Sequence, residues 1–159
     1  MRWLAATVGP LVSKESSVLE IGSLNVNGTP RSVLKCKHWT GLDKVAGKGV
    51  DIVSSAAEYL EHKKHAFDLV VACECYEHDP KWWVTDTLAK SALKVNALYV
   101  VTAPAIGFPF HDYGGDYYRF TEMAFREVIF ENYDIINLRT IEAEHPMENT
   151  VVGVARKVK

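Results

Sequence analysis

The sequence predicts an α/β fold: one doubly wound, mostly parallel sheet with helices on both faces and an antiparallel pair of strands at one edge. Apolar, strand-like runs alternate with helix-like segments along most of the chain, which is the pattern of a parallel sheet covered on both faces. Near the end, the strand-like runs 135–141 and 150–158 follow one another with only a turn around Pro146 between them. Two strands without a crossover helix between them are expected to pair antiparallel.

The first half of the chain supplies four of the expected strands. The runs 18–22, 39–42 and 50–53 are the first three, and the segment 44–49 between the last two is too short for a crossover helix. The run 68–73 is apolar and β-branched between charged residues, which indicates a strand buried on both faces at the centre of the sheet.

Helix signals frame the fifth strand, which is expected at 98–102. Before it, Asp79 can cap a helix that has Pro80 at its first position, where proline is tolerated because its missing N–H would be unpaired anyway. After it, Thr121 can cap a second helix, which is expected to end near Asn132.

Length and composition predict one globular domain, spanning 1–159. The formal net charge of -2 gives no basic surface for a polyanion, so nucleic acid is not an expected partner. The sequence has no apolar run near the ~20 residues that span a bilayer, so no membrane segment is expected. Three cysteines without a CxxC pair indicate a reducing, cytoplasmic setting. The oligomeric state is left open.

Glycine and two acidic residues mark the ends of the first two strands. Gly22 allows a sharp turn and close approach of a ligand, and Gly28 can do the same at the far end of that turn. Glu20 stands near the carboxyl end of the first strand, where open α/β sheets bind ligands, and suits a positively charged group. Asp43 follows Gly22 by about 20 residues, the spacing of an acid that accepts both ribose hydroxyls. An ordinary strand-to-helix turn is the alternative.

Together with these residues, longer segments resemble the class I S-adenosylmethionine-dependent methyltransferases, which have a Rossmann-like fold. The segments are GKGVDIV at 47–53, FDLVVACECYEH at 67–78 and TAPAIGFPFHDYGGDYYRFT at 102–121. The resemblance covers about residues 17–135 in the family's order. It departs from the family at Leu24, where a second glycine often stands, and at Ser55, near which many members have an acid.

The resemblance implies S-adenosylmethionine as cofactor and a set of residues around it. These are Glu20, Gly22, Asn25 and Gly28 at the methionine part, Asp43 at the ribose, Leu42, Lys44 and Ser55 at the adenine, and Cys73 and Glu74 beside the sulfonium. No covalent role is expected for Cys73, because the adjacent Glu74 opposes formation of a thiolate.

The segment after the fifth strand is rich in aromatic residues and glycine. We expect it to form a wall around the methyl acceptor, although it could instead only cover the hydrophobic end of the sheet. The expected substrate-binding residues are Phe108, Phe110, Tyr113, Tyr117 and Tyr118. An ion pair between Asp116 and Arg119 would fix the segment.

His111 is the candidate general base, because an imidazole can remove a proton near neutral pH, and His78 is the alternative. Each could instead be an ordinary surface histidine. No metal is expected, because the spacing of these histidines and of Asp79, Asp112 and Asp116 matches no ligand motif.

These observations predict methyl transfer to an oxygen or nitrogen of a small-molecule acceptor. The alternatives are a protein that binds S-adenosylmethionine without methylating and an enzyme that cleaves it. A nucleotide-binding oxidoreductase is disfavoured, because Gly22 and Gly28 lack the G-x-G-x-x-G spacing.

Overall fold

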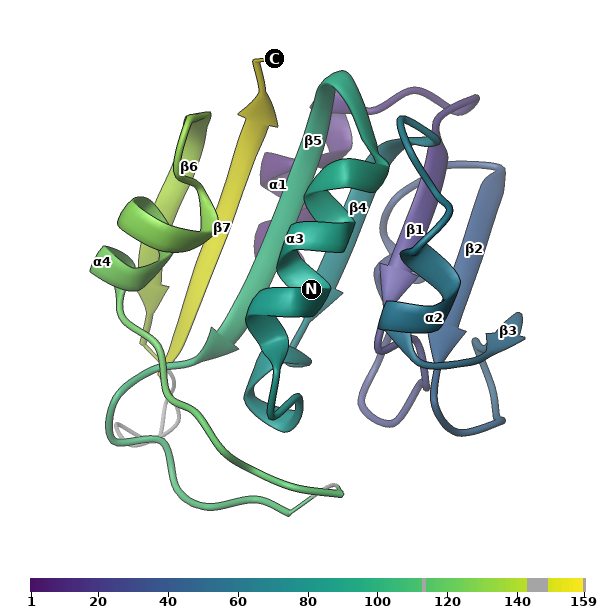
Figure 1. Ribbon diagram of the computed structural model, residues 1–159. Helices are drawn as coiled ribbons and strands as arrows, with labels where there is room; N and C mark the ends of the chain where they lie inside the picture. The colour runs from purple at the N-terminus through teal and green to yellow at the C-terminus, as the bar shows by residue number, and fades with distance from the viewer. Residues whose placement is uncertain (113, 143–148, 159) are drawn as a thin grey trace.

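A computed structural model describes residues 1–112, 114–142 and 149–158. Within them, seven strands form one sheet in the order β3-β2-β1-β4-β5-β7-β6 (Figure 1). Strand β7 is antiparallel to both of its neighbours, β5 and β6, and the other neighbouring pairs are parallel. This order confirms the predicted fold class, including the antiparallel pair at one edge.

Each expected strand is present, with different ends. The strands are β1 Ser17–Ile21, β2 His38–Asp43, β3 Ile52–Val53, β4 Phe67–Cys73, β5 Leu93–Pro104, β6 Tyr133–Ile141 and β7 Thr150–Lys157. Strand β5 extends to Pro104 because β7 pairs with it up to that residue. The expected turn around Pro146 lies outside the described residues.

Among the described residues, three α-helices cover one face of the sheet and one lies on the other (Figure 1). The helices are α1 Arg2–Thr7, α2 Ala56–Leu60, α3 Trp82–Ala92 and α4 Glu122–Ala124, which continues into a π-helical turn, η4, Phe125–Ile129. Short 3-10 turns are η1 Gly9–Leu11, η2 Pro30–Ser32 and η3 Tyr76–His78. As predicted, no helix joins β2 to β3. The face that such a crossover helix could have covered is therefore packed mainly by α1.

The N-cap prediction is confirmed for Thr121 and is wrong for Asp79, because the N-cap of α3 is Lys81, which makes no side-chain cap hydrogen bond. The Thr121 hydroxyl accepts the N–H of Ala124 at 3.1 Å. Asp79 accepts the N–H of Lys81 at 2.9 Å and the Thr85 hydroxyl at 2.6 Å. The α-helix itself begins at Trp82 rather than at Pro80, because Lys81 has non-helical dihedral angles of -130° and 39°.

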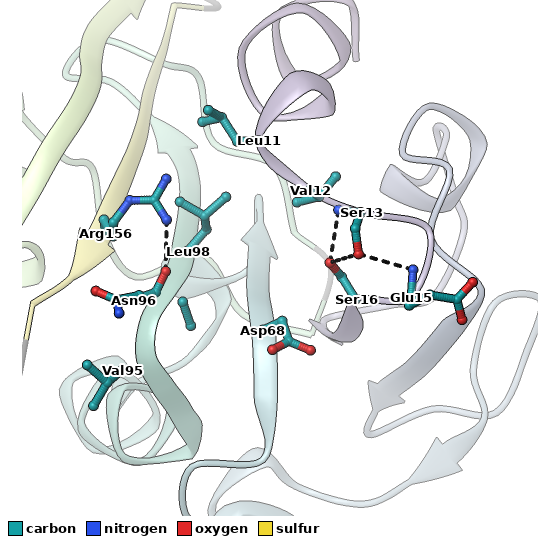
Figure 2. A pocket seen from close by; sticks show the side chains of 11 residues that line it. Leu11, Val12, Ser13, Glu15, Ser16, Asp68, Val95, Asn96, Leu98 and Arg156 are labelled. Atoms are coloured by element: carbon teal, nitrogen blue, oxygen red, sulfur yellow. Dashed lines mark hydrogen bonds between the residues drawn. The ribbon is translucent and has the colours of Figure 1, made fainter.

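A surface cavity of about 420 Å³ lies at the amino ends of β4 and β5, lined in part by Ser13, Asp68, Asn96 and Arg156 (Figure 2). A second, of about 440 Å³, lies beside Ile106, Met123 and Thr140. Neither is lined by a residue expected to bind the cofactor. No helix among the described residues is long and apolar enough to cross a membrane.

Candidate functional site

The carboxyl ends of β1, β2 and β4 meet at one edge of the sheet, the lower edge in Figure 1. Strand β1 lies between β2 and β4, so the chain leaves β1 toward one side of the sheet and β4 toward the other. Open α/β sheets bind ligands in the crevice at such a switch in strand order. The residues predicted from the sequence are therefore at the edge where a ligand is expected.

Gly22 ends β1 in a conformation that favours glycine, with φ of +74°. A Cβ atom there would lie 3.0 Å from the sulfur of Cys75, so the turn and the segment after β4 can approach this closely only at a glycine. Gly28, with φ of +115°, donates its N–H to the side chain of Asn25 at 3.0 Å. Asn25 thereby shapes the turn in which the sequence placed it.

Asp43 joins the first two loops at this edge. Its carboxylate accepts the N–H of Leu24 and the N–H of Val45, each at 3.0 Å. A carboxylate has about four acceptor sites, so two remain for a ligand. The structure thus places the acid at the end of β2 beside the glycine turn.

Glu20 is 4% exposed, and burial raises its pKa to about 7 against the opposing effects of Thr29 and Arg31. The Thr29 hydroxyl donates to it at 3.1 Å, and Arg31 Nε lies 3.6 Å from its second oxygen. Arg31 also pairs with Asp51. A positively charged ligand group at Glu20 would therefore share the carboxylate with Arg31.

The remaining expected cofactor residues differ in exposure and partners. Leu42 is buried, Lys44 is exposed, and the Ser55 hydroxyl caps α2 by accepting the N–H of Glu58 at 3.2 Å. Desolvation and then the charge of Glu74 raise the pKa of the Cys73 thiol to about 12. A thiol with so high a pKa is not a nucleophile near neutral pH.

The aromatic segment, described at residues 105–112 and 114–120, folds back onto the end of β4. The N–H of Tyr117 donates to the backbone carbonyl of Glu77 at 2.8 Å, and the hydroxyl of Tyr118 donates to Pro80 at 3.0 Å. Phe110 and Tyr117 are exposed, and Phe108 packs against His111 with ring centroids 5.0 Å apart. Tyr113 lies outside the described residues.

The predicted pair of Asp116 and Arg119 is present and holds this segment together. Arg119 donates to Asp116 at 2.7 Å and to the backbone oxygens of Phe108 and Pro109 at 2.9 and 2.8 Å. The guanidinium keeps the pKa of the Asp116 carboxyl well below its usual range. Asp116 in turn accepts the backbone N–H of His111 at 2.8 Å, which fixes the position of that histidine.

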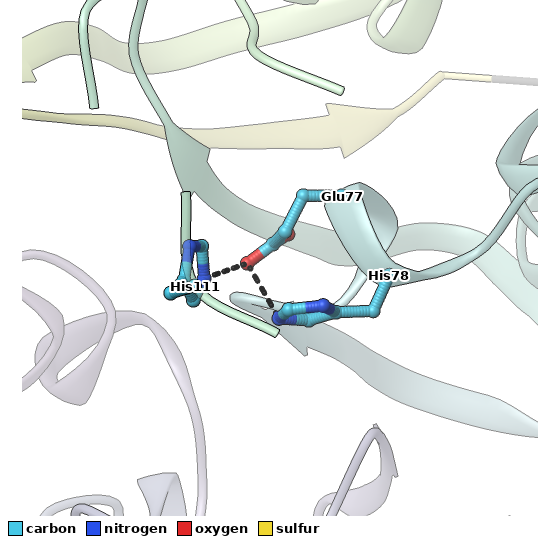
Figure 3. Close-up of side chains that lie close together, drawn as sticks. All are labelled: Glu77, His78 and His111. Carbon is cyan, nitrogen blue, oxygen red and sulfur yellow. Dashed lines mark ion pairs between the residues drawn. The ribbon is translucent and has the colours of Figure 1, made fainter. Parts of the chain in front are cut away.

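His78 and His111 lie side by side, with ring centroids 4.9 Å apart, and both face Glu77 (Figure 3). The distances from Glu77 Oε1 to Nε2 of the histidines are 3.6 Å for His78 and 3.9 Å for His111. Burial and the charge of Glu74 raise the pKa of Glu77 to about 9. Sequence reasoning missed Glu77, although an acid directly before His78 in the FDLVVACECYEH segment was a signal for it.

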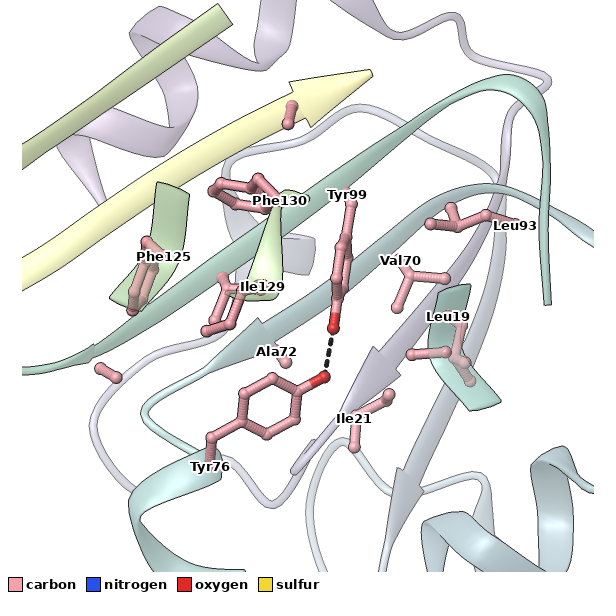
Figure 4. Packing of buried hydrophobic residues seen from close by; sticks show 14 of the residues in the cluster. Leu19, Ile21, Val70, Ala72, Tyr76, Leu93, Tyr99, Phe125, Ile129 and Phe130 are labelled. Carbon is pink, nitrogen blue, oxygen red and sulfur yellow. Dashed lines mark hydrogen bonds between the residues drawn. The ribbon is translucent and has the colours of Figure 1, made fainter. Parts of the chain in front are cut away.

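A buried polar network anchors the turn that carries Glu77 and His78. The hydroxyls of Tyr76 and Tyr99 are hydrogen-bonded (Figure 4). Tyr99 also donates to Asp86 of α3 at 2.9 Å. Both tyrosines are fully buried. The turn η3 is therefore tied to both β5 and α3, which gives Glu77 and His78 a rigid base.

No protein-family model matches the sequence, and no curated protein matches it. Solved structures do. A Burkholderia thailandensis 1,6-didemethyltoxoflavin-N1-methyltransferase with bound S-adenosylhomocysteine has a TM-score of 0.77 at 16% identity, over 99% of this chain and 78% of that one. The N-methyltransferase NodS of Bradyrhizobium japonicum, also with S-adenosylhomocysteine, has a TM-score of 0.74 at 13% identity, over 99% and 85%. The [4+2]-cyclase SpnF has 0.73 at 12%, over 98% and 80%. At these identities the likeness shows a shared fold, that of S-adenosylmethionine-dependent methyltransferases.

Proposed function

We propose that this chain transfers a methyl group from S-adenosylmethionine to an oxygen or nitrogen of a small-molecule acceptor. The observation that carries the proposal is the placement of Gly22 and Asp43 at the switch in strand order, within the methyltransferase fold. Two proteins of this fold are described with the product S-adenosylhomocysteine bound. Methyl transfer needs little covalent help, because the sulfonium is already an activated electrophile and the protein mainly aligns the acceptor and excludes water.

In this proposal the cofactor lies across the ends of β1 and β2. The turn containing Gly22, Asn25 and Gly28 surrounds the methionine part, with Glu20 behind it. Asp43 accepts the ribose hydroxyls through its two unused acceptor sites. Leu42, Lys44 and Ser55 contact the adenine, and Cys73 and Glu74 lie near the sulfonium.

The acceptor lies under the aromatic segment, where Phe108, Phe110, Tyr113, Tyr117 and Tyr118 form its wall. The acceptor's proton leaves at the neighbouring histidines, and His111 is the proposed general base. Asp116 lies 3.4 Å from Nδ1 of His111, and a carboxylate in this place orients an imidazole for proton transfer at Nε2. His78 is the second candidate. We place nucleic acid outside the acceptor class because the net charge is -2.

Binding without methylation, or cleavage of the cofactor, is the second candidate function. SpnF is described as a cyclase and has the same fold, so the fold alone does not fix the reaction.

Incubation of the protein with methyl-labelled S-adenosylmethionine and a fractionated metabolite pool tests the proposal. We expect S-adenosylhomocysteine together with a labelled acceptor, identified by mass spectrometry. Release of methylthioadenosine would instead show a lyase. Product no higher than in an Asp43→Ala control, across a broad pool, would favour a binding protein.

A further inference from the structure

Glu77, His78 and His111, the Glu77 cluster, approach one another without making hydrogen bonds (Figure 3). Glu77 Oε1 lies 3.6 Å and 3.9 Å from the two Nε2 atoms, too far for an N–H···O hydrogen bond. All three potential ligand atoms nevertheless lie within 4.8 Å of one another. The three side chains are therefore closely packed, at ion-pair distance and not at hydrogen-bond distance.

The contacts of the other ring nitrogens locate the imidazole protons. His78 Nδ1 contacts the carbonyl oxygen of Gly115. His111 Nδ1 faces the Pro109 carbonyl and the Asp116 carboxylate, each at 3.4 Å. A carbonyl or an ionised carboxylate can only accept, so each neutral imidazole carries its proton on Nδ1. Both Nε2 atoms then turn a lone pair toward Glu77.

The Glu77 side chain is 0% exposed, and neither of its oxygens has a hydrogen-bond partner among the described residues. A buried polar group without a partner costs free energy, and a buried charge costs more. Two imidazole lone pairs and a carboxylate oxygen thus converge from η3 and from the aromatic segment. A cation between them would satisfy all three.

We propose that Glu77, His78 and His111 bind one divalent transition-metal ion, represented best by Zn²⁺. Two imidazole nitrogens and one carboxylate oxygen form a ligand set for such ions that leaves a coordination position open, whereas Mg²⁺ and Ca²⁺ prefer oxygen ligands alone. Ligand atoms 2.0–2.1 Å from a tetrahedral ion are about 3.4 Å apart. The two Glu77 distances, 3.6 and 3.9 Å, need a small contraction to reach that value, and the two imidazole nitrogens, which lie within 4.8 Å of each other, would also have to move closer together.

The surroundings of the cluster match those of a metal site. Histidine ligands usually donate their second ring N–H to a backbone carbonyl or a carboxylate, and the Nδ1 atoms here lie beside such acceptors. No metal was expected from the residue spacing. The set considered there omitted Glu77 and contained two acids that have other roles: Asp79 binds Thr85, and Asp112 accepts the N–H of Gly115 at 2.8 Å.

The metal also narrows the class of methyl acceptor to molecules with a hydroxyl group, an inference that rests on the proposed function. A hydroxyl oxygen bound at the open position would have its pKa lowered by the ion, and its proton would pass to solvent. That oxygen would attack the methyl carbon, so an O–CH₃ bond forms while the S–CH₃ bond breaks with its electron pair staying on sulfur. The products are a methyl ether and S-adenosylhomocysteine. With the ion bound, His111 would be a ligand, so solvent would take the acceptor's proton in its place.

Calorimetric titration of the whole, chelator-treated chain with Zn²⁺ alone tests the site, with Mg²⁺ as the comparison ion. We expect one Zn²⁺ per chain and no Mg²⁺ binding. Glu77→Gln and His111→Ala should each weaken Zn²⁺ binding by on the order of 100-fold or more, and Asp116→Asn, which removes a supporting contact, by about 10- to 100-fold. His62→Ala is the matched control, because the His62 side chain is 88% exposed and lies outside the cluster.

Equal Zn²⁺ affinity in wild type and in folded Glu77→Gln and His111→Ala proteins, checked by circular dichroism, would overturn the proposal. Cobalt absorption gives a second readout, since Co²⁺ bound at the cluster should lose its visible bands in Glu77→Gln. Parallel titration with S-adenosylhomocysteine separates this inference from the proposed function. Zn²⁺ binding without S-adenosylhomocysteine binding would support the metal site and contradict the proposed cofactor. S-adenosylhomocysteine binding without Zn²⁺ binding would support the cofactor and contradict the metal site.

Discussion

At the scale of single residues, Asp43 has the most clearly defined place in the proposed cofactor site. Replacing it with alanine removes the proposed ribose contacts and the bonds to Leu24 and Val45. We expect Asp43→Ala to weaken S-adenosylhomocysteine binding by about 1 to 3 kcal/mol, the range for hydrogen bonds to a charged group. Titration calorimetry measures this. Asp134→Ala, an exposed acid on β6, is the control and should bind normally. Unchanged affinity in a folded Asp43→Ala protein would contradict the ribose assignment.

His111 provides a second test at this scale. Because it lies in the Glu77 cluster and not at the ends of β1 and β2, His111→Ala should lower kcat by about 10²-fold or more and leave cofactor affinity nearly unchanged. Steady-state kinetics on the identified acceptor, together with cofactor titration, check this split. Full activity in His111→Ala, with loss in His78→Ala, would transfer the role to His78.

At the scale of elements, the aromatic segment depends on one arginine. Arg119 binds Asp116 and two backbone oxygens, so it connects both ends of residues 108–119. Arg119→Lys keeps the charge but loses the planar, multiply bonded guanidinium. We expect faster cleavage between Phe108 and Tyr118 in limited proteolysis of Arg119→Lys than of wild type. Arg139→Lys on β6 is the control. Equal cleavage rates in the two variants would show that Arg119 does not hold the segment.

Ligands should act on the same segment. Closure over cofactor and acceptor would bury its exposed rings, Phe110 and Tyr117. We therefore expect cofactor plus acceptor to protect the bonds between Phe108 and Tyr118 from protease, beyond any protection by cofactor alone. Identical digestion patterns in all conditions would mean that this segment is not a lid.

At the scale of the whole molecule, Glu77 should make stability depend on pH. In metal-free buffer the folded protein keeps the proton of Glu77 up to about pH 9, whereas the unfolded chain loses it near the ordinary value of 4.5. Between these values the folded state binds more protons, so the free energy of unfolding should fall as pH rises. Glu20, with a pKa of about 7, acts in the same direction below pH 7.

Glu77→Gln removes the larger of these two effects. We expect the variant to lose less stability than wild type between pH 5 and 9, by on the order of a few kcal/mol. Urea unfolding at several pH values, followed by circular dichroism with a chelator present, measures this. Parallel stability curves for the two proteins would show that Glu77 titrates normally.

Local signals in the amino-acid sequence were enough to predict the fold class and the approximate position of each strand among the described residues. Apolar periodicity and capping residues are local signals, so 68–73 and Thr121 could be read without knowing what they contact. The ends of elements were less accurate, because long-range pairing sets them: β5 is extended to Pro104 by β7. The glycine turn and Asp43 could also be recognised from the sequence, because they stand at the ends of two adjacent strands, β1 and β2.

Only the tertiary structure decided what the charged side chains do. It gave Glu20 the neighbour Arg31, and it brought Glu77 and His78 of one turn to His111 of a distant segment. These contacts arise where the aromatic segment folds back onto the end of β4. The spacing of residues along the sequence does not indicate that the two segments meet. Burial then sets the protonation of Glu77, because the cost of a buried charge depends on surroundings that exist only in the folded chain.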